Sequence, residues 1–271
     1  MPTRTCIWLV ACAWSLSCGG AAFAAERPAL TLESIFSGTA FANKSIDNVQ
    51  WSEDGASFSF TAPGRDPALL DILEYDGASG RTRLLLAGTA LTVDGAPVGL
   101  SGYEWTKDRR YLLVSGPVTR TWDNVFEGPW FVHETGEEAL RPLADGKPLR
   151  NVHLSPDGRR VGYVLENDLY ITELESGATR AVTSDGSPNV FNGIFDYGST
   201  EFGFTDAWHW SPDGSRIAFW RLDVTDVKVF HIVDELGKYN KVYDLKYPNT
   251  GERHAVNRIG VYELRSGRTA W

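Results

Sequence analysis

The stretch WHWSPDGSRIAFW (Trp208–Trp220) contains a Ser-Pro-Asp-Gly phrase, and related phrases recur along the chain. The four copies are VQWSEDGASFSF from Val49, YEWTKDRRYLLV from Tyr103, VHLSPDGRRVGYV from Val152 and WHWSPDGSRIAFW itself. Their anchor residues, Trp51, Trp105, Leu154 and Trp210, are separated by 54, 49 and 56 residues. A period of about 50 residues is typical of repeated structural units.

Each copy predicts a β-hairpin. Pro presets the backbone of the turn, Gly accepts a positive φ, and the residues that follow alternate with period two, as in Phe58/Phe60 and Val161/Tyr163. A second motif, with Ser-Gly or Thr-Gly as a tight connection, predicts another hairpin in each unit. Its copies are LLDILEYDGASGRTRLLL near Ile72, the looser GPWFVHETGEEALRPL near Phe131, NDLYITELESGATRAVT near Tyr170 and RIGVYELRSGRTAW near Val261.

Four short antiparallel strands per unit predict an all-β fold, with each unit a blade of a β-propeller. Ser155, Asp157, Ser211 and Asp213 resemble an acid–nucleophile set, but their recurrence predicts a structural turn instead. No window supports a long amphipathic helix. We therefore expect residues 25–271 to form a partial, unclosed β-propeller of four-stranded antiparallel blades.

The first 24 residues, MPTRTCIWLVACAWSLSCGGAAFA, have the pattern of a signal peptide: one early charge at Arg4, an apolar run and a small-x-small end at Ala22–Ala24. We expect cleavage near Ala24 and export to the periplasm or the medium. A lipid anchor at Cys18 is the alternative, although Ser15 stands where such sites favour a large aliphatic residue.

The composition narrows the functional classes. All three cysteines, Cys6, Cys12 and Cys18, lie in the leader, so the mature chain has no disulfide, thiol nucleophile or cysteine-bound metal. Loss of Arg4 takes the formal charge from −9 to −10. An acidic chain without a basic run argues against nucleic acid and against an anionic membrane surface as partners. About 247 mature residues suffice for a large core.

Two regions interrupt the repeat: SDGSPNVFNGIFDYGSTEFGFTDAW (184–208), aromatic-rich around the acid Glu201, and residues 222–257, which lengthen the last blade. Long loops on a rigid scaffold often carry function. NGIFDYGSTEFGFTDAWHWSPDGSRIAFWRLD resembles the segment of dipeptidyl peptidase IV-type serine peptidases in which an acidic motif precedes a blade. KYPNTGERHAVNRIGVYEL resembles the same family's Tyr-Pro-x-x-Gly stretch, and LTLESIFSG (30–38) its opening segment.

The resemblance implies a propeller that covers an α/β-hydrolase domain and an acid that holds the free amino terminus of a peptide. Glu201 matches that acid, and an ammonium about 4 Å from a carboxylate gains about 4 kcal/mol at an effective dielectric of 20. Phe195, Tyr197, Phe202 and Phe204 are expected to exclude water from it. The alternative is that Glu201 has no binding role and is a solvated loop acid paired with a nearby arginine.

The chain departs from the family pattern at two places. Dipeptidyl members carry two adjacent Glu residues, whereas Thr200 precedes Glu201 here, and a single Glu resembles the tripeptidyl branch. The family's substrate-binding Arg follows a Trp, whereas Asp123 follows Trp122 here, which leaves Arg120 as a candidate. Product length therefore stays open, and Arg120, Tyr197 and Phe202 are secondary substrate-binding candidates beside Glu201.

Catalytic residues are not recognisable in the sequence. The Gly-x-Ser-x-Gly elbow of α/β-hydrolases does not occur in it. His133 and His231 lie near acids, but neither has a second histidine at ligand spacing, so we expect strand-surface or loop histidines and no metal or other cofactor.

The sequence thus predicts the amino-terminal propeller portion of a longer exported aminopeptidase, inactive alone. A stand-alone periplasmic propeller that binds partners is the alternative, and a different catalytic propeller is a third hypothesis. The expected partners are a peptide substrate, a hydrolase domain and, in the full-length form, a second copy of the chain. Four units leave two blade faces uncovered, and a sharp two-state melt of the monomer would argue against a truncated chain.

Overall fold

The computed structural model describes residues 30–37, 45–120, 126–137, 139–195 and 201–271. The chain divides into a small unit that ends at Ser45 and a compact unit over Ile46–Trp271. The expected signal peptide lies outside the described residues. In the small unit, α1 (Leu32–Phe36) begins with a capping box in which Thr31 and Ser34 bond each other's backbone N–H groups, at 3.1 and 2.9 Å. Among the described residues, no helix has the length and apolar character that a membrane crossing requires.

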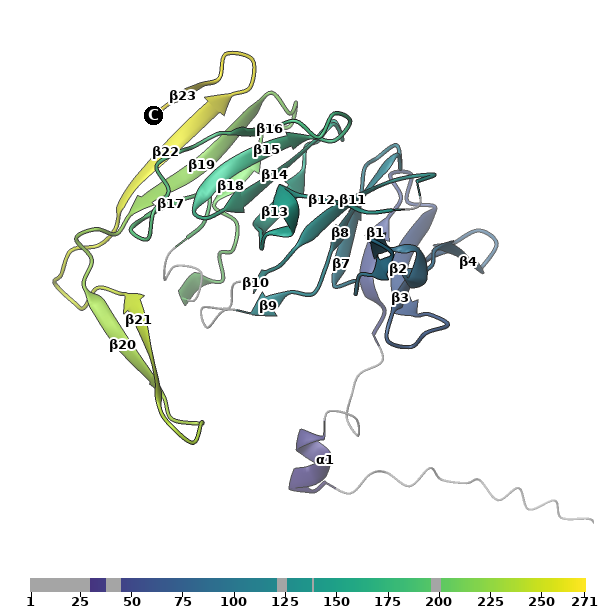
Figure 1. Cartoon of the computed structure of the whole chain (residues 1–271), viewed down its shortest axis with the longest axis horizontal. Coiled ribbons are helices and arrows are strands. Elements are labelled where there is room, and N and C mark those ends of the chain that lie inside the picture. The colour runs from purple at the N-terminus through teal and green to yellow at the C-terminus, as the bar shows by residue number, and fades with distance from the viewer. Residues whose placement is uncertain (1–29, 38–44, 121–125, 138, 196–200) are drawn as a thin grey trace, which may run out of the picture. The chain divides into compact units, whose positions relative to one another are not determined.

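The compact unit consists of antiparallel sheets in chain order (Figure 1). The first contains β1 (Asp47–Trp51), β2 (Ser57–Pro63), β3 (Leu70–Asp76) and β4 (Arg81–Leu86). The second contains β7 (Gly102–Trp105), β8 (Tyr111–Ser115), β11 (Trp130–Glu134) and β12 (Arg141–Pro142). The third contains β13 (Arg150–Leu154), β14 (Arg160–Leu165), β15 (Asp168–Glu173) and β16 (Thr179–Ala181). The fourth contains β17 (Val190–Asn192), β18 (Trp208–Trp210), β19 (Arg216–Asp223), β22 (Val256–Glu263) and β23 (Arg268–Ala270).

The predicted all-β class and the hairpins of both motifs are confirmed. The fourth sheet has five strands instead of the expected four, because β17 and β18 both pair with β19. Short elements connect the sheets: η1 (Gly88–Ala90), η2 (Ala144–Gly146), and the ribbons β5 (Thr92–Val93) with β6 (Ala96–Pro97) and β9 (Thr119–Arg120) with β10 (Phe126–Glu127).

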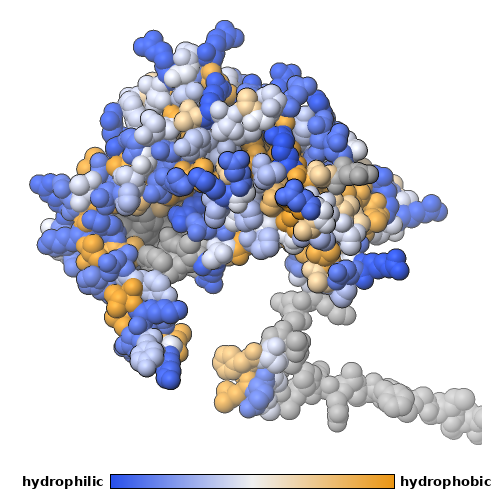
Figure 2. Space-filling view, viewed as in Figure 1, coloured by the Kyte–Doolittle hydropathy of each residue, from blue (hydrophilic) through white to orange (hydrophobic). Residues whose placement is uncertain are grey.

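Only the two ends of the region 222–257 extend the last sheet, where Leu222 pairs with Asn257 and Asp223 with Val256. The middle of the region forms a separate two-stranded hairpin, β20 (Val229–Asp234) with β21 (Lys241–Lys246), before the chain returns to β22. Its exposed apolar residues are visible in orange in Figure 2. Leu236 at its tip is 99% exposed and Tyr239 is 80% exposed, so the described residues leave this hairpin largely uncovered.

The recurrent Ser-x-Asp phrase builds the same turn in every sheet, as predicted. The Ser or Thr hydroxyl donates to the Asp two residues later at 2.5–2.6 Å. The same hydroxyl oxygen accepts the backbone N–H five residues later at 2.9–3.0 Å. Hydrogen bonds from Ser211 and Ser215 lower the pKa of Asp213 to about 2. These side chains are therefore engaged with their own turns.

In the described part of the compact unit, three apolar cores lie between consecutive sheets. The first joins sheets one and two around Ile72, Leu112 and Phe131. The next joins sheets two and three around Leu113 and Tyr163, and the last joins sheets three and four around Trp208. Trp208 is fully buried, and its indole N–H donates to Asn151 O at 3.0 Å, so one side chain links the fourth sheet to the third.

The first sheet has an unusual distribution of polarity. Its face toward the second sheet carries the buried polar residues Ser59, Thr61 and Glu74, and the Tyr103 hydroxyl donates to Ser59 at 2.8 Å. Its other face carries a row of aromatic rings, in which Phe58 lies 5.1 Å from Trp51, 5.8 Å from Phe60 and 5.3 Å from Tyr75. Phe58 and Phe60 alternate as predicted, but they point away from the core that the described residues build.

Candidate functional site

Glu201 and Phe202 have helical backbone a few residues before β18, and the Glu201 carboxylate contacts the second non-repeating region. The Tyr247 hydroxyl donates to Glu201 Oε1 at 2.9 Å. Tyr247 directly follows β21 and belongs to the Tyr-Pro-x-x-Gly stretch. The fold therefore brings together the two regions that interrupt the repeat, through two residues that lie 46 positions apart in the sequence.

Aromatic rings surround this acid in sequence and form one chain in space. Phe195 lies 5.8 Å from Phe204 and 5.4 Å from Trp220 of β19, and Phe204 lies 6.0 Å from Phe202. The expectation that these rings exclude water is wrong for Phe202 and Phe204, which are 69% and 57% exposed. Phe202 and Phe204 are exposed to solvent because no described segment covers them.

The carboxylate of Glu201 is exposed, and Tyr247 is its hydrogen-bond partner within the described residues. No described arginine, lysine or histidine lies within ion-pair distance of it, so the alternative of an acid paired with a nearby arginine finds no support there. A phenol orients a carboxylate without neutralising its charge. The described partner of the exposed Glu201 carboxylate is thus a hydroxyl group and not a basic side chain.

Contacts with β13 tether the segment between Glu201 and β18. The Asn151 amide donates to Gly193 O at 2.9 Å and to Thr205 O at 2.8 Å. Asp206 Oδ1 lies 3.2 Å from His153 Nε2, and this contact lowers the pKa of Asp206. β13 therefore bonds to the chain on both sides of Glu201, at Gly193 before it and at Thr205 and Asp206 after it.

The same end of β13 also holds the ribbon that carries Arg120. Arg150 pairs with Glu127 of β10 at 3.0 Å, and β10 pairs with β9 in the register Phe126 to Arg120. Arg120 is exposed at the end of β9. The segments that carry Arg120 and Glu201 are thus both attached to β13, the first through Arg150 and the second through Asn151. Tyr197, Thr200, Trp122 and Asp123 lie outside the described residues.

The two histidines near acids occupy different environments. His133 is a buried residue of β11, not the surface or loop residue expected, and burial lowers the pKa of its imidazole below 6.5. His231 lies on β20, exposed as expected, with Nδ1 2.7 Å from Asp244 of β21. No group of three or more His, Cys, Asp or Glu side chains with metal-binding geometry occurs in the described part of the chain.

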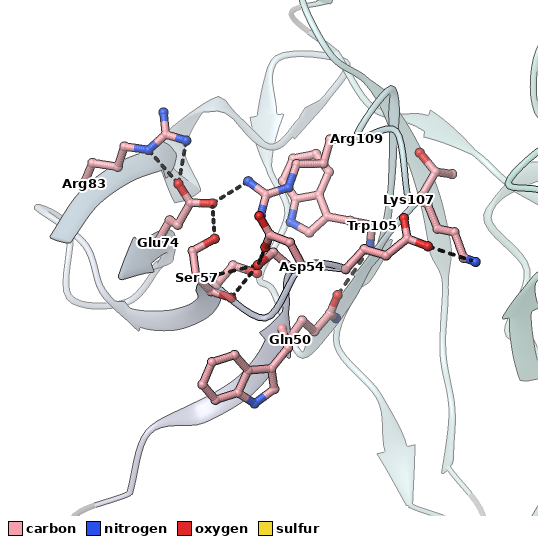
Figure 3. A pocket seen from close by; sticks show the side chains of 13 residues that line it. Gln50, Asp54, Ser57, Glu74, Arg83, Trp105, Lys107 and Arg109 are labelled. Carbon is pink, nitrogen blue, oxygen red and sulfur yellow. Dashed lines mark hydrogen bonds and ion pairs between the residues drawn. The ribbon is translucent and has the colours of Figure 1, made fainter. Parts of the chain in front are cut away.

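A cavity of about 740 Å³ lies between the first two sheets (Figure 3). Glu74 on its wall accepts hydrogen bonds from Arg83 at 2.6 Å and from Arg109 at 2.5 Å, and Ser57 donates to it at 3.3 Å. The dashed lines in Figure 3 join Glu74 to Arg83 and Arg109, and a second ion pair joins Glu53 to Lys107. Asp54, another acid of this lining, accepts hydrogen bonds from Ser52 Oγ and Ala56 N–H, so the carboxylates of this cavity bond to residues of the fold itself.

Sequence reasoning singled out Glu201 but missed its contacts. Tyr247 is a residue of the Tyr-Pro-x-x-Gly motif, and its place in a second non-repeating region is the sequence signal that points to the site. Trp220 lies inside the repeated hairpin, so the repeat concealed its place beside Phe195. Both contacts depend on how β19, β21 and the acidic segment meet in space.

A sequence model described as the dipeptidyl peptidase IV (DPP IV) N-terminal region matches residues 106–271. Dipeptidyl aminopeptidase B of Saccharomyces cerevisiae is 29% identical over 192 residues, covering 68% of this chain and 23% of that protein. Dipeptidyl-aminopeptidase B of Aspergillus niger is 27% identical over 207 residues, covering 70% of this chain and 23% of that protein. The crystal structure of Porphyromonas gingivalis dipeptidyl peptidase 4 matches with a TM-score of 0.77 at 24% identity, covering 89% of this chain and 34% of that one. The chain thus spans about a quarter to a third of these relatives.

Proposed function

Because the chain belongs to the dipeptidyl peptidase IV N-terminal region family, we propose that it is the propeller portion of an exported dipeptidyl or tripeptidyl aminopeptidase-type serine peptidase. Its sheets are blades of an unclosed β-propeller that admits a peptide and holds its amino terminus. Hydrolysis belongs to an α/β-hydrolase domain, whose Gly-x-Ser-x-Gly elbow is not among these 271 residues.

The observation that carries the proposal is the uncompensated, oriented carboxylate of Glu201. Its bond from Tyr247 joins the two regions that interrupt the repeat. A peptide's α-ammonium is the cation that this charge would hold, and the exposed rings of Phe202 and Phe204 offer apolar surface to the adjoining side chains. In this proposal Arg120 and Tyr197 contact the same peptide.

The exposure of Glu201 sets the expected strength of binding. At about 4 Å, an ion pair contributes about 1 kcal/mol in water and about 4 kcal/mol at an effective dielectric of 20. The chain by itself lies nearer the first value, because solvent reaches the carboxylate. A domain that covers the site would strengthen the same contact, which is how a propeller and a hydrolase domain would cooperate.

The distribution of apolar residues supports the blade assignment. The aromatic row of the first sheet faces away from the described cores, and the fourth sheet exposes Ile259 and Val261 on β22. An open array of blades has packed interfaces inside and an uncovered apolar face at each end. The first and fourth sheets fit this pattern. Further blades of the same kind would cover both faces.

A second copy of the chain is the remaining proposed partner. The hairpin β20–β21 carries the exposed side chains Phe230, Val233, Leu236 and Val242 (Figure 2). Exposed apolar residues gathered on one element mark an interaction surface. In the full-length form we expect this hairpin to contact its counterpart in a homodimer.

Replacing Glu201 with Gln tests whether this carboxylate binds the amino terminus of a peptide. We expect the ¹⁵N-labelled wild-type chain to bind the tripeptide Ala-Pro-Ala with millimolar affinity and about tenfold more tightly than its N-acetylated form, about 1.4 kcal/mol. Chemical shifts of the Trp220 indole would report binding, because this ring packs against Phe195. Glu201→Gln should abolish the preference for the free amine.

Glu235→Gln is the matched control, since it removes the same charge from an exposed position on the β20–β21 hairpin. It should bind both peptides as the wild type does. A preference for the free amine that survives Glu201→Gln would contradict the proposed function, as would an equal loss in both variants.

A further inference from the structure

Tyr247 is held in place at its backbone and along its ring. Its N–H donates to Lys228 O at 3.1 Å, which fixes it at the base of the β20–β21 hairpin. Its ring lies 6.2 Å from that of Phe230 on β20. The adjacent Lys246 donates to Val227 O at 2.9 Å, so both strands anchor this corner. The hydroxyl that reaches Glu201 therefore starts from a rigid support.

Among the described residues, Tyr247 provides the side-chain hydrogen bond that restrains the Glu201 carboxylate. Glu201 is exposed, and a glutamate side chain in solvent samples several rotamers. The bond from Tyr247 occupies Oε1, and Oε2 has no hydrogen-bond partner among the described residues. An arginine in place of Tyr247 would also orient the carboxylate, but it would cancel the charge that an ammonium needs.

We propose that Tyr247 is a positioning residue: it holds one oxygen of Glu201 so that the other faces the substrate's amino terminus with its charge intact. The inference rests on the proposed function of Glu201 and adds to it a dependence on the β20–β21 hairpin. Loss of the phenol should weaken the binding of a free amine without affecting contacts made elsewhere along the peptide.

Tyr247→Phe tests this role, because it removes the hydroxyl and keeps the ring that contacts Phe230. We expect Ala-Pro-Ala to bind about fivefold more weakly, and N-acetyl-Ala-Pro-Ala to bind unchanged. Tyr239→Phe is the matched control, since Tyr239 lies 80% exposed on the same hairpin, away from Glu201. The double variant Glu201→Gln/Tyr247→Phe should bind no more weakly than Glu201→Gln, because Tyr247 acts through Glu201.

The outcomes separate the two proposals. If Glu201→Gln abolishes the preference for the free amine but Tyr247→Phe retains it in full, the positioning role is wrong and the grip by Glu201 stands. If Glu201→Gln retains the preference, the proposed function fails and the role of Tyr247 fails with it. If Tyr247→Phe does not fold, Phe230→Leu serves instead, because it loosens the packing of the Tyr247 ring. We then expect Ala-Pro-Ala to bind twofold to threefold more weakly. Unchanged binding of Ala-Pro-Ala by Phe230→Leu would overturn the inference.

Discussion

Glu74 is a carboxylate buried between the first two sheets, and two arginines make its burial tolerable. Its side chain is 7% exposed, and it pairs with Arg83 and Arg109. Burial raises the pKa of the carboxyl, but the hydrogen bonds from Arg109 and Arg83 outweigh it and hold the pKa below 4.5. Such a residue stabilises the fold only while both arginines stay in contact with it.

Glu74→Gln should lower the free energy of unfolding by about 2 kcal/mol, because it leaves two guanidinium groups facing a neutral amide. The matched control is Glu53→Gln, whose partner Lys107 is 3.4 Å away on the rim of the same cavity and mostly exposed. The control should change stability by less than about 0.5 kcal/mol. Urea denaturation at pH 7 measures both, and equal losses would contradict the assignment.

The contacts of Glu74 with Arg83 and Arg109 also predict how stability changes with pH. Because the folded-state pKa of Glu74 is depressed, its contribution is present above the ordinary carboxyl pKa of 4.5 and is lost as the pH falls through the folded value. The stability difference between wild type and Glu74→Gln should therefore shrink below pH 4.5. A difference that grows on acidification would reverse the sign of this argument.

Among the elements, the hairpin β14–β15 shows how tightly consecutive sheets approach. Gly162 of β14 faces the ring of Trp208 so closely that a Cβ at this position would overlap it. The glycine is required by this contact, since no positive φ is involved. The third and fourth sheets can pack at this distance because one residue has no side chain.

Gly162→Ala should therefore destabilise the chain by about 1–3 kcal/mol through overpacking against Trp208. Gly99→Ala is the control, because a Cβ there would meet only Pro117, at an ordinary contact distance of 3.7 Å. Thermal denaturation followed by tryptophan fluorescence would show the loss and report the displaced ring. Unchanged melting of Gly162→Ala would mean that the two sheets are further apart than described.

At the scale of the compact unit, packing is complete inside and incomplete at both ends of the series of sheets. The three cores bury their residues almost fully, whereas Ile259 and Val261 on β22 are 52% and 38% exposed. Apolar surface left in water favours association with any complementary face. The chain as given should therefore associate with itself at raised concentration.

The double variant Ile259→Lys/Val261→Lys should shift the chain toward the monomer in size-exclusion chromatography with little change in its melting temperature, since both side chains point outward. Ser184→Lys/Thr250→Lys adds the same charge at exposed polar positions and serves as the control. If the control variant shifts the chain toward the monomer to the same extent, then net charge and not the apolar face governs self-association.

The sequence by itself determined the strands, the turns and the repeat. Each of these depends on neighbours along the chain, such as the bond from Ser155 to Asp157 two residues later. The same local evidence marked Glu201 as an acid outside the repeat.

Only the tertiary structure decided which residues meet across the repeats. It placed Tyr247 on Glu201, made a separate hairpin of the middle of region 222–257, and buried His133. It also turned Ser59 inward and Phe58 outward, although both lie on the same alternating strand. The alternation of side chains along a strand shows which residues share a face, but the neighbouring sheet decides which face is covered. The contact between Tyr247 and Glu201, 46 residues apart, depends on how whole sheets pack.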